Sequence, residues 1–188
     1  MAMTVEIKGN KLCIEIDLEK PTPSASGKTL VVASNRQHQD VSPQCIANCT
    51  ITLQLLMQKG KLAIDDRFRI LGEYLNKTQP KKGRGAGDVF VKWALQNNAN
   101  PARCDRVPIV EHAERLFESF PADAELVTFD PPDRKFVAVS AAHPEKPPIL
   151  QATDSKWLGW APALKRHGVH VEFLCKEDIQ RFQKNKAK

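Results

Sequence analysis

Segments with a helical repeat of apolar residues alternate with short apolar runs from residue 41 to the end of this chain. The runs "KLAID", "ILQAT" and "VHVEFL" are typical of buried strands, and a segment with helical spacing follows each of them. Strands that alternate with helices in this way form a parallel sheet that helices cover on both faces. We therefore predict an α/β fold with three layers, α/β/α, around a central and mostly parallel sheet. In such a fold, ligands bind at the carboxyl ends of the strands.

Local signals mark the helix boundaries. One helix is predicted to begin at Ser42-Pro43 and to end at Gly60. Asp65 or Asp66 is expected to cap the next helix, "RFRILGEYLNK", because a carboxylate accepts the free N–H groups of a first turn. The segment "EHAERLFESF" is amphipathic. Further helices are predicted for "GDVFVKWALQNN", "DRKFVAVSAAH", residues 156–167 and the segment from residue 176 onward.

The first 34 residues have a different pattern. "VEIKGNKLCIEIDLE" alternates apolar and polar residues on both sides of Gly9-Asn10, which predicts a β-hairpin with its turn at these residues. Residues 30–33 are expected to form a short buried strand. The chain is thus predicted to consist of an N-terminal β-hairpin and linker (residues 1–29), the α/β domain (residues 30–180) and a basic tail (residues 181–188).

Composition limits the class of protein. A chain of 188 residues with 41% hydrophobic content can bury a core without disulfides. Its five cysteines contain no CxxC pair; Cys45 and Cys49 are four residues apart on a predicted helix, but no Cys/His pair follows at zinc spacing. We interpret all five as reduced core thiols. No run is apolar enough to cross a membrane and no signal pattern opens the chain, so we expect a cytoplasmic protein with no membrane partner.

A basic loop is the main charge feature of the sequence. The net charge of +6 permits a polyanionic partner, and Lys77, Lys81, Lys82 and Arg84 lie together in a loop between two predicted helices. Cations in such a loop bind phosphate groups without reading base sequence, which predicts RNA contacts at these residues. The alternative is a loop that is merely solvated.

Four acidic residues lie beside apolar segments. Asp130 and Asp133 flank two prolines at the start of a predicted helix, Asp154 follows the strand "ILQAT", and Glu73 lies in the middle of "RILGEYL". Each has a simple structural explanation: Asp130, Asp133 and Asp154 can cap helices, Asp133 can also pair with a neighbouring arginine, and Glu73 can face water. Taken singly, none of them indicates a function.

Their order along the chain is more informative. Glu73 in "LGEYL", Asp133 in "FDPPDRKFVAVSAAH" and Asp154 in "ILQATDSKW" precede the strand "GVHVEFL". This order resembles that of PIN-like domains, a nuclease family that includes bacterial toxin ribonucleases, over about residues 35–180. The resemblance implies that Glu73, Asp133 and Asp154 are catalytic, that they and Asp130 bind Mg²⁺ or Mn²⁺, and that the chain cleaves RNA. It also implies an antitoxin protein as a partner.

The implied chemistry requires oxygen ligands. Hard divalent cations bind carboxylates, and the ion neutralises acids that would otherwise repel one another. A bound ion lowers the pKa of its water and stabilises charge on the attacked phosphate, so that no protein nucleophile is needed. The five histidines therefore need no catalytic role.

The chain departs from the family pattern at one position. PIN-like domains carry an aspartate at the end of the first strand, where this chain has Ala33; Asp40, Asp65 and Asp66 are the candidates for a substitute. Residues 1–34 resemble a short, unrelated β-hairpin protein, as in a fusion that replaced the first strand. Two hypotheses follow: a metal-dependent endoribonuclease, or a degenerate PIN-like domain that binds RNA or protein without cutting. An unrelated α/β module whose acids are caps is the third possibility.

Overall fold

The computed structural model of this chain describes the backbone of residues 3–8, 11–16, 41–83 and 85–186, and the side chains of residues 41–83 and 85–184. The chain divides into two units, Met1–Leu30 and Val31–Lys188. In the first unit, β1 (Met3–Lys8) pairs antiparallel with β2 (Lys11–Ile16), and Lys8 lies opposite Lys11. This pairing confirms the predicted hairpin. The strand predicted at residues 30–33 lies outside the described residues.

The second unit contains two short parallel sheets. β3 (Leu62–Asp65) pairs with β4 (Cys104–Val107), and β7 (Ile149–Gln151) pairs with β8 (Val171–Phe173). The α/β class and the parallel strand pairing are thereby confirmed. Among the described residues each sheet has two strands, so the single central sheet of a three-layer fold stays a prediction.

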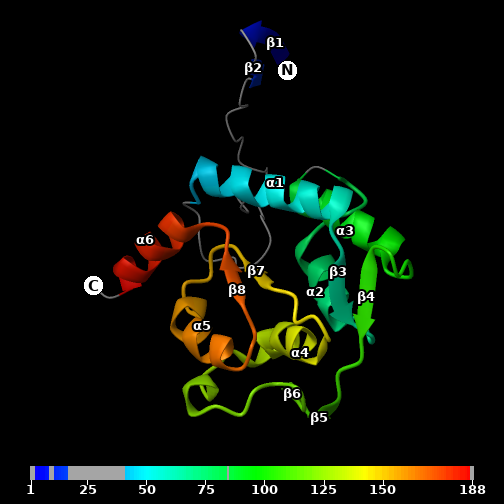
Figure 1. Ribbon diagram of the computed structural model, residues 1–188, viewed down its shortest axis with the longest axis vertical. Coiled ribbons are helices and arrows are strands. Elements are labelled where there is room, and N and C mark those ends of the chain that lie inside the picture. The colour runs from blue at the N-terminus through cyan, green and yellow to red at the C-terminus, as the bar shows by residue number, and fades with distance from the viewer. Residues whose placement is uncertain (1–2, 9–10, 17–40, 84, 187–188) are drawn as a thin grey trace. The chain divides into compact units, whose positions relative to one another are not determined.

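The helices of the second unit surround these strands (Figure 1). Helix α4 contacts both parallel sheets, through β3 and through β7. No helix in the part of the chain that the structure describes is long and apolar enough to cross a membrane. The helices are α1 (Pro43–Lys59), α2 (Arg69–Lys77), α3 (Ala86–Asn97), α4 (Arg134–Ala142), α5 (Trp157–Arg166) and α6 (Lys176–Lys186), with 3₁₀ turns η1 (Ala124–Leu126) and η2 (Pro131–Asp133).

The sequence signals at the ends of α1 act as predicted. The Ser42 hydroxyl accepts a hydrogen bond from the backbone N–H of Cys45 at 3.2 Å, Pro43 occupies the first helical position, and Gly60 ends the helix. Proline needs no N–H partner at this position and its fixed φ suits the helix. Local chemistry therefore determines where α1 begins and ends.

A buried aspartate caps α2. Asp65 is fully buried, and its two carboxylate oxygens accept the N–H groups of Arg69 and Ile70, both at 2.9 Å. The Arg69 guanidinium lies 3.5 Å from the same carboxylate. Of the two predicted caps, Asp65 is therefore the one that the structure confirms. Because both oxygens serve the helix, Asp65 does not replace the aspartate that is missing at Ala33.

Removal of this cap should destabilise the fold. We expect Asp65→Ala to lower the free energy of unfolding by about 2–4 kcal/mol, because two backbone N–H groups lose their acceptor beside a buried strand. The measurement is urea unfolding followed by circular dichroism. The matched control is Asp66→Ala at the exposed neighbouring position, which should change stability by no more than about 0.5 kcal/mol. Equal effects of the two substitutions would contradict the assigned cap.

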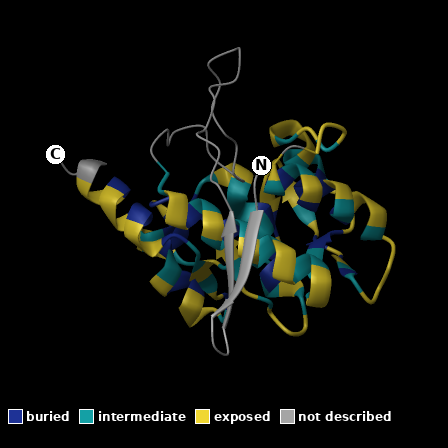
Figure 2. Ribbon diagram, turned by 90° about the horizontal axis from the view of Figure 1, so that it is seen from above, coloured by how far each residue is buried: buried dark blue, intermediate teal, exposed yellow. Residues whose placement is uncertain are grey.

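Two hydrophobic clusters share helix α4. The first joins β3, β4 and α4 through Ile64, Val107 and Ala138. The second gathers Val137 of α4 with Phe129 and Trp157. Consecutive α4 residues thus enter different clusters, which explains why its sequence is apolar on most sides. Figure 2 shows buried and exposed residues alternating along the other helices, as expected of amphipathic helices at a surface.

Two parts of the sequence fold in ways that we did not predict. The amphipathic segment "EHAERLFESF" contains the short antiparallel strands β5 (Glu111–Ala113) and β6 (Leu116–Phe117). Arg115 takes a positive φ of 60° in the turn between them, where the Glu111 carboxylate accepts its N–H at 2.7 Å. Strand β4, which is embedded in a largely polar sequence, was also not expected.

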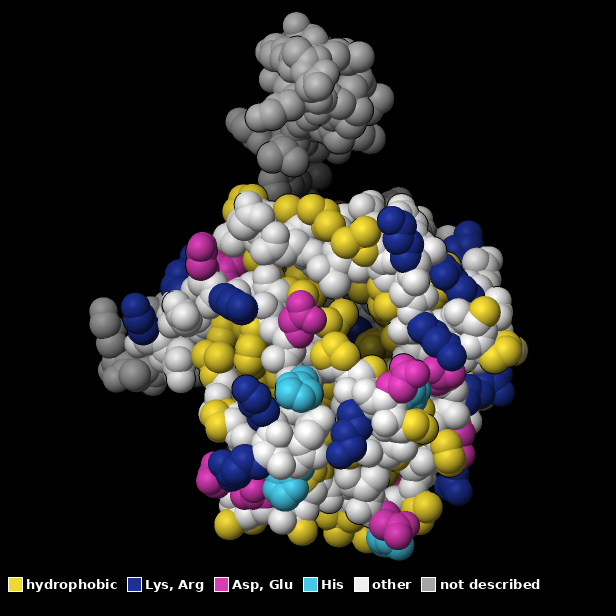
Figure 3. All heavy atoms as spheres, in the orientation of Figure 1, with side chains coloured by type: hydrophobic (Ala, Val, Ile, Leu, Met, Phe, Trp, Pro, Cys, Tyr) yellow, Lys and Arg dark blue, Asp and Glu magenta, His cyan; other side chains and the backbone are white. Residues whose placement is uncertain are grey.

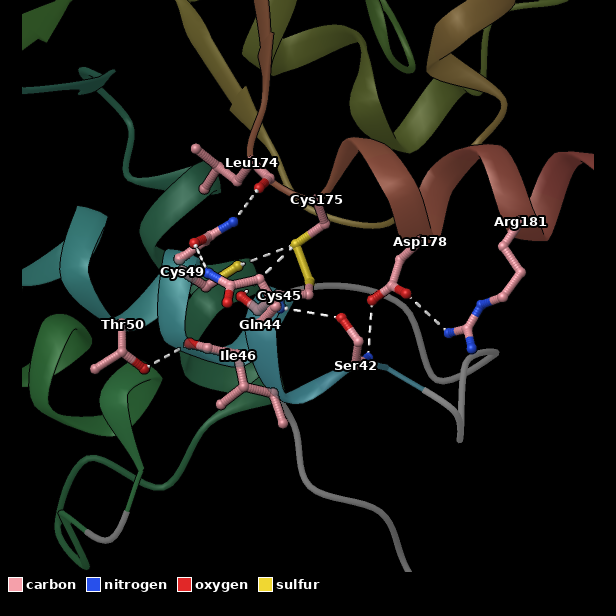
Figure 4. The surroundings of a disulfide bond; sticks show 11 residues. Ser42, Gln44, Cys45, Ile46, Cys49, Thr50, Leu174, Cys175, Asp178 and Arg181 are labelled. Carbon is pink, nitrogen blue, oxygen red and sulfur yellow. Dashed lines mark hydrogen bonds and ion pairs between the residues drawn. A yellow bond between two sulfur atoms is a disulfide. The ribbon is translucent and has the colours of Figure 1, made fainter. Parts of the chain in front are cut away.

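The interpretation of all five cysteines as reduced thiols is wrong for two of them. Cys45 and Cys175 form a disulfide with Cα atoms 5.0 Å apart (Figure 4). The two residues are 130 positions apart, so their spacing in the sequence gives no sign of the bond. Cys49 and Cys104 are free and buried, as predicted. The side chain of Cys13 lies outside the described residues.

Candidate metal centre

The structure brings together three of the four predicted acids. Asp130 precedes η2, Asp133 ends it, and Asp154 follows β7. One carboxylate oxygen from each residue lies within 4.8 Å of the other two. Asp154 is buried, whereas Asp130 and Asp133 are half-buried. We refer to these three residues as the aspartate cluster.

Local geometry forms this cluster from two loops. Two prolines hold residues 130–133 in a single 3₁₀ turn, in which the Asp133 N–H donates to the Asp130 carbonyl at 3.0 Å. Asp154 stands at the carboxyl end of the parallel strand β7, the predicted place for a site, and its carboxylate accepts the N–H of Lys156 at 3.0 Å. The Trp157 indole N–H joins the loops, because it donates to the Asp133 carboxylate at 3.3 Å.

Lys156 is a cation of this site that sequence reasoning missed. Its ammonium lies 2.8 Å from the Asp130 carboxylate, and its side chain is 50% exposed. The hydrogen bond to Asp130, with the charges of Asp130, Asp154 and Asp133, raises the pKa of Lys156. Its partner Asp130 lies 26 residues earlier in the chain, so the sequence offers no local signal for this pair.

Burial and neighbouring charges both act on the Asp133 carboxyl. Burial, followed by the nearby charges of Glu73 and Asp154, raises the pKa of Asp133, although the hydrogen bond from Trp157 and the charge of Lys135 oppose the shift. Neighbouring carboxylates raise one another's pKa, and a bound cation stabilises their ionised forms.

The structure places Glu73 in a different set of contacts. Its carboxylate binds Lys77 of the same helix at 2.5 Å and the ammonium of Lys135 at the start of α4. Burial alone would raise the pKa of Glu73, but the hydrogen bonds from Lys135 and Lys77 outweigh it and lower the pKa. Glu73 is therefore not one of the three clustered acids, although its charge reaches Asp133.

Lys135 is the second cation that sequence reasoning missed. It is 9% exposed, it pairs with Glu73 and donates to the Pro132 carbonyl, and its ammonium lies 4.9 Å from the centre of the Phe136 ring. Lys135 thus links α2 to the turn that carries Asp130 and Asp133. Burial of a charged ammonium is costly unless it is paired and hydrogen-bonded, and the Glu73 carboxylate and the Pro132 carbonyl meet this requirement.

A cleft lies next to the turn that carries Asp130 and Asp133, although none of the three clustered acids lines it. It has a volume of about 470 Å³ and includes Pro131 and Pro132 of η2 in its wall. Glu73 and Lys135 line it from one side, and residues of the β5–β6 turn line it from another. The charged residues of the lining are Arg69, Glu73, Glu111, Glu114, Arg115 and Lys135.

The predicted basic loop is only partly engaged with the site. Lys77 pairs with Glu73, whereas Lys81 and Lys82 are exposed; Arg84 lies outside the described residues. The Asp88 carboxylate shapes the loop, because it accepts the N–H groups of Gln79 at 2.8 Å and of Gly85 at 3.3 Å. On the face that Figure 3 shows, lysine and arginine side chains are dispersed and do not form one patch.

Of the remaining candidates for the missing aspartate, the two that the structure describes, Asp65 and Asp66, do not join the aspartate cluster. Asp65 caps α2, and Asp66 is exposed. Asp40 and Ala33 lie outside the described residues. Among the described residues, the acids that converge closely enough to share an ion are Asp130, Asp133 and Asp154.

Comparison of the chain with known protein families, with curated proteins and with solved structures finds no match. Three converging carboxylates can bind a hard cation, and the half-exposed lysine beside them can bind a negatively charged ligand.

Proposed function

We propose that this chain is a metal-dependent endoribonuclease of the PIN-like type, with its metal at the aspartate cluster. The observation that carries the proposal is the convergence of Asp130, Asp133 and Asp154 from two separated loops. The proposal includes a three-layer α/β/α fold around a central, mostly parallel sheet. It also includes an antitoxin protein as the partner that restrains the enzyme.

The donor set fits Mg²⁺ or Mn²⁺. Mg²⁺ and Mn²⁺ are hard cations that carboxylate oxygens bind. The three residues each offer one carboxylate oxygen within 4.8 Å of the other two, so they would hold such an ion together. When bound, such an ion supplies a hydroxide near neutral pH and stabilises charge on a phosphate group.

The chain's own residues prepare this site. Asp130, Asp133 and Asp154 hold the ion, and the Trp157 indole fixes the orientation of Asp133. The half-exposed Lys156 can move from Asp130 toward a phosphate group when a divalent ion takes its place. Lys135 neutralises Glu73, which lowers the repulsion that RNA meets at the cleft. Lys77, Lys81, Lys82 and Arg84 are the proposed phosphate contacts of the RNA.

Metal binding is the direct test of this site. We expect the wild-type chain to bind Mn²⁺ at the aspartate cluster, as measured by electron paramagnetic resonance of free Mn²⁺. Asp154→Asn should weaken Mn²⁺ binding by more than about 100-fold. Mutation of a residue that only supports a metal ligand already weakens binding by about 10–100-fold, and loss of the ligand itself should have a larger effect. Asp66→Asn removes an exposed carboxylate elsewhere and should leave binding unchanged. Equal Mn²⁺ binding by wild type and Asp154→Asn would refute the proposed centre.

One observation favours a second function. The Lys156 ammonium already provides a positive charge at the cluster, 2.8 Å from Asp130. If this lysine is the permanent counterion, the domain is a non-catalytic module that binds RNA or protein. Its RNA affinity should then fall steeply with salt and be indifferent to EDTA, because phosphate contacts release counterions and need no divalent metal. RNA binding that EDTA abolishes would exclude this module.

A further inference from the structure

A second cluster of ligand atoms lies where the C-terminal helix meets α1. Cys45 and Cys49 lie one turn apart on α1, and Cys175 directly precedes α6. Cys45 and Cys175 form the disulfide, and the Cys49 sulfur lies 3.7 Å from that of Cys175 (Figure 4). All three are buried, with exposures of 2–3%. We refer to these three residues as the sulfur cluster.

The third cysteine makes this arrangement more than a cross-link. A disulfide needs two sulfur atoms, whereas the sulfur atoms of Cys45, Cys49 and Cys175 all lie within 4.8 Å of one another. We propose that the reduced sulfur cluster binds one soft divalent ion, such as Zn²⁺, and that the disulfide is its oxidised, metal-free state. Nothing in the proposed nuclease chemistry requires this second site.

The distances suit thiolate coordination. Zn–S bonds of about 2.3 Å in a tetrahedron place neighbouring sulfur atoms roughly 3.8 Å apart. The separation of 3.7 Å between Cys49 and Cys175 already matches this value. Reduction breaks the bond between the Cys45 and Cys175 sulfur atoms. The Cys45 sulfur can then move to a similar distance from the Cys175 sulfur. Three thiolates then form one face of the tetrahedron, and the fourth position takes water or another ligand.

Two helix N-termini favour thiolates at this place. Cys45 lies in the first turn of α1, and the Cys175 carbonyl accepts the N–H of Ile179 at 3.0 Å, so Cys175 stands at the N-terminus of α6. The partial positive charge of a helix N-terminus stabilises a nearby thiolate. A metal ion that binds these residues displaces the protons of their thiols.

Reduction of the disulfide must precede metal binding. A dithiol reductant gives two electrons and two protons to the Cys45–Cys175 disulfide and becomes a disulfide itself, leaving three protein thiols. A divalent ion then replaces the three thiol protons, which pass to the solvent. Metal binding should therefore strengthen as the pH rises.

The surrounding contacts give the site a structural consequence. The Asp178 carboxylate of α6 accepts the Ser42 N–H at 2.8 Å, and the Asn48 side chain donates to the Leu174 carbonyl at 3.1 Å. The sulfur cluster thus lies in the contact that joins α6 to α1. The oxidised chain is cross-linked across this contact by the disulfide. The reduced chain is cross-linked there by the bound metal ion.

The test uses the full chain and Co²⁺ as the spectroscopic probe. After reduction by a phosphine under argon and removal of the reductant, we expect one Co²⁺ per chain with an intense thiolate-to-metal charge-transfer band. Zn²⁺ should displace the Co²⁺ and abolish the band. Carboxylates give no such band, so the result is independent of the aspartate cluster and of the proposed nuclease. The chain with its disulfide intact should show no band.

Cysteine variants identify the ligands. Cys49→Ala retains both residues of the disulfide and should still fold, but the affinity of its reduced form for Co²⁺ should fall by more than about 100-fold. Cys104→Ala is the matched control, because Cys104 is also free and buried but belongs to the cluster around β3 and β4. The Cys13→Ala/Cys104→Ala variant should bind like wild type. Absence of the band in the reduced chain, or an unchanged band in Cys49→Ala, would overturn the proposal.

Discussion

Asp133→Asn should reduce RNA cleavage by the Mn²⁺-loaded protein roughly a thousandfold, as measured by the initial rate on a single-stranded RNA. Stabilisation by a bound metal ion is worth several kcal/mol, and each 1.4 kcal/mol corresponds to about a factor of ten in rate. Asparagine keeps the shape of the side chain and can still accept the Trp157 N–H, so the fold should survive. The experiment therefore removes a charged ligand with little change in packing.

Metal-free stability provides the control for this variant. The raised pKa of Asp133 means that the folded chain holds this proton more tightly than the unfolded chain. The resulting stabilisation is fully present below the unfolded pKa of about 3.9 and is lost as the pH rises through the higher folded pKa. Metal-free Asp133→Asn should therefore be less sensitive to pH than wild type and more stable at neutral pH. A variant that lost both activity and stability would indicate misfolding, and retained cleavage would refute the catalytic assignment.

The parts of the fold that the sequence predicts correctly depend on interactions between near neighbours. Ser42 and Gly60 bound α1 through contacts within four residues, and Asp65 caps α2 through N–H groups four and five positions ahead. Helical periodicity likewise predicts α5 and α6, because each has a buried face.

Strand β4 shows why other elements escape prediction. Its sequence, "CDRV", has two charged residues between the two buried ones and lacks both an apolar run and strict alternation. Tertiary contacts stabilise it instead: it pairs in parallel with β3, and the Asp105 carboxylate binds Lys61 at 2.7 Å and His143 at 3.1 Å. Partners this far along the chain cannot be inferred from local propensity.

The candidate site also has residues that the sequence suggested and contacts that only the tertiary structure reveals. The resemblance to PIN-like domains suggested Glu73, Asp130, Asp133 and Asp154 as metal ligands, and the three aspartates meet whereas Glu73 does not join them. The pairing of Glu73 with Lys135 and of Asp130 with Lys156 links residues 62 and 26 positions apart, and only the fold brings them together. The Cys45–Cys175 disulfide, at a separation of 130 residues, is the extreme case.

Trp157→Ala should destabilise the protein by about 3–5 kcal/mol, as expected for truncation of a fully buried aromatic side chain. Trp157 is 1% exposed, and its ring meets that of Phe129 edge-on with centroids 5.0 Å apart. Because domains of this size are stable by only about 5–15 kcal/mol, the loss should be obvious in urea unfolding followed by circular dichroism.

Trp157→Phe separates the packing of this side chain from its hydrogen bond. Phenylalanine retains most of the ring contacts but cannot donate to Asp133, so its stability loss should be smaller than that of Trp157→Ala, whereas Mn²⁺ affinity should still fall. Trp93 is the matched control: it stacks on Phe90 with centroids 6.1 Å apart, away from the aspartate cluster, and Trp93→Phe should leave Mn²⁺ affinity unchanged. If Trp157→Phe binds Mn²⁺ as wild type does, the indole N–H does not orient Asp133, and the core and the metal centre are independent. A selective loss of affinity would mean that the residue that packs the second hydrophobic cluster also positions the ligand that the chemistry needs.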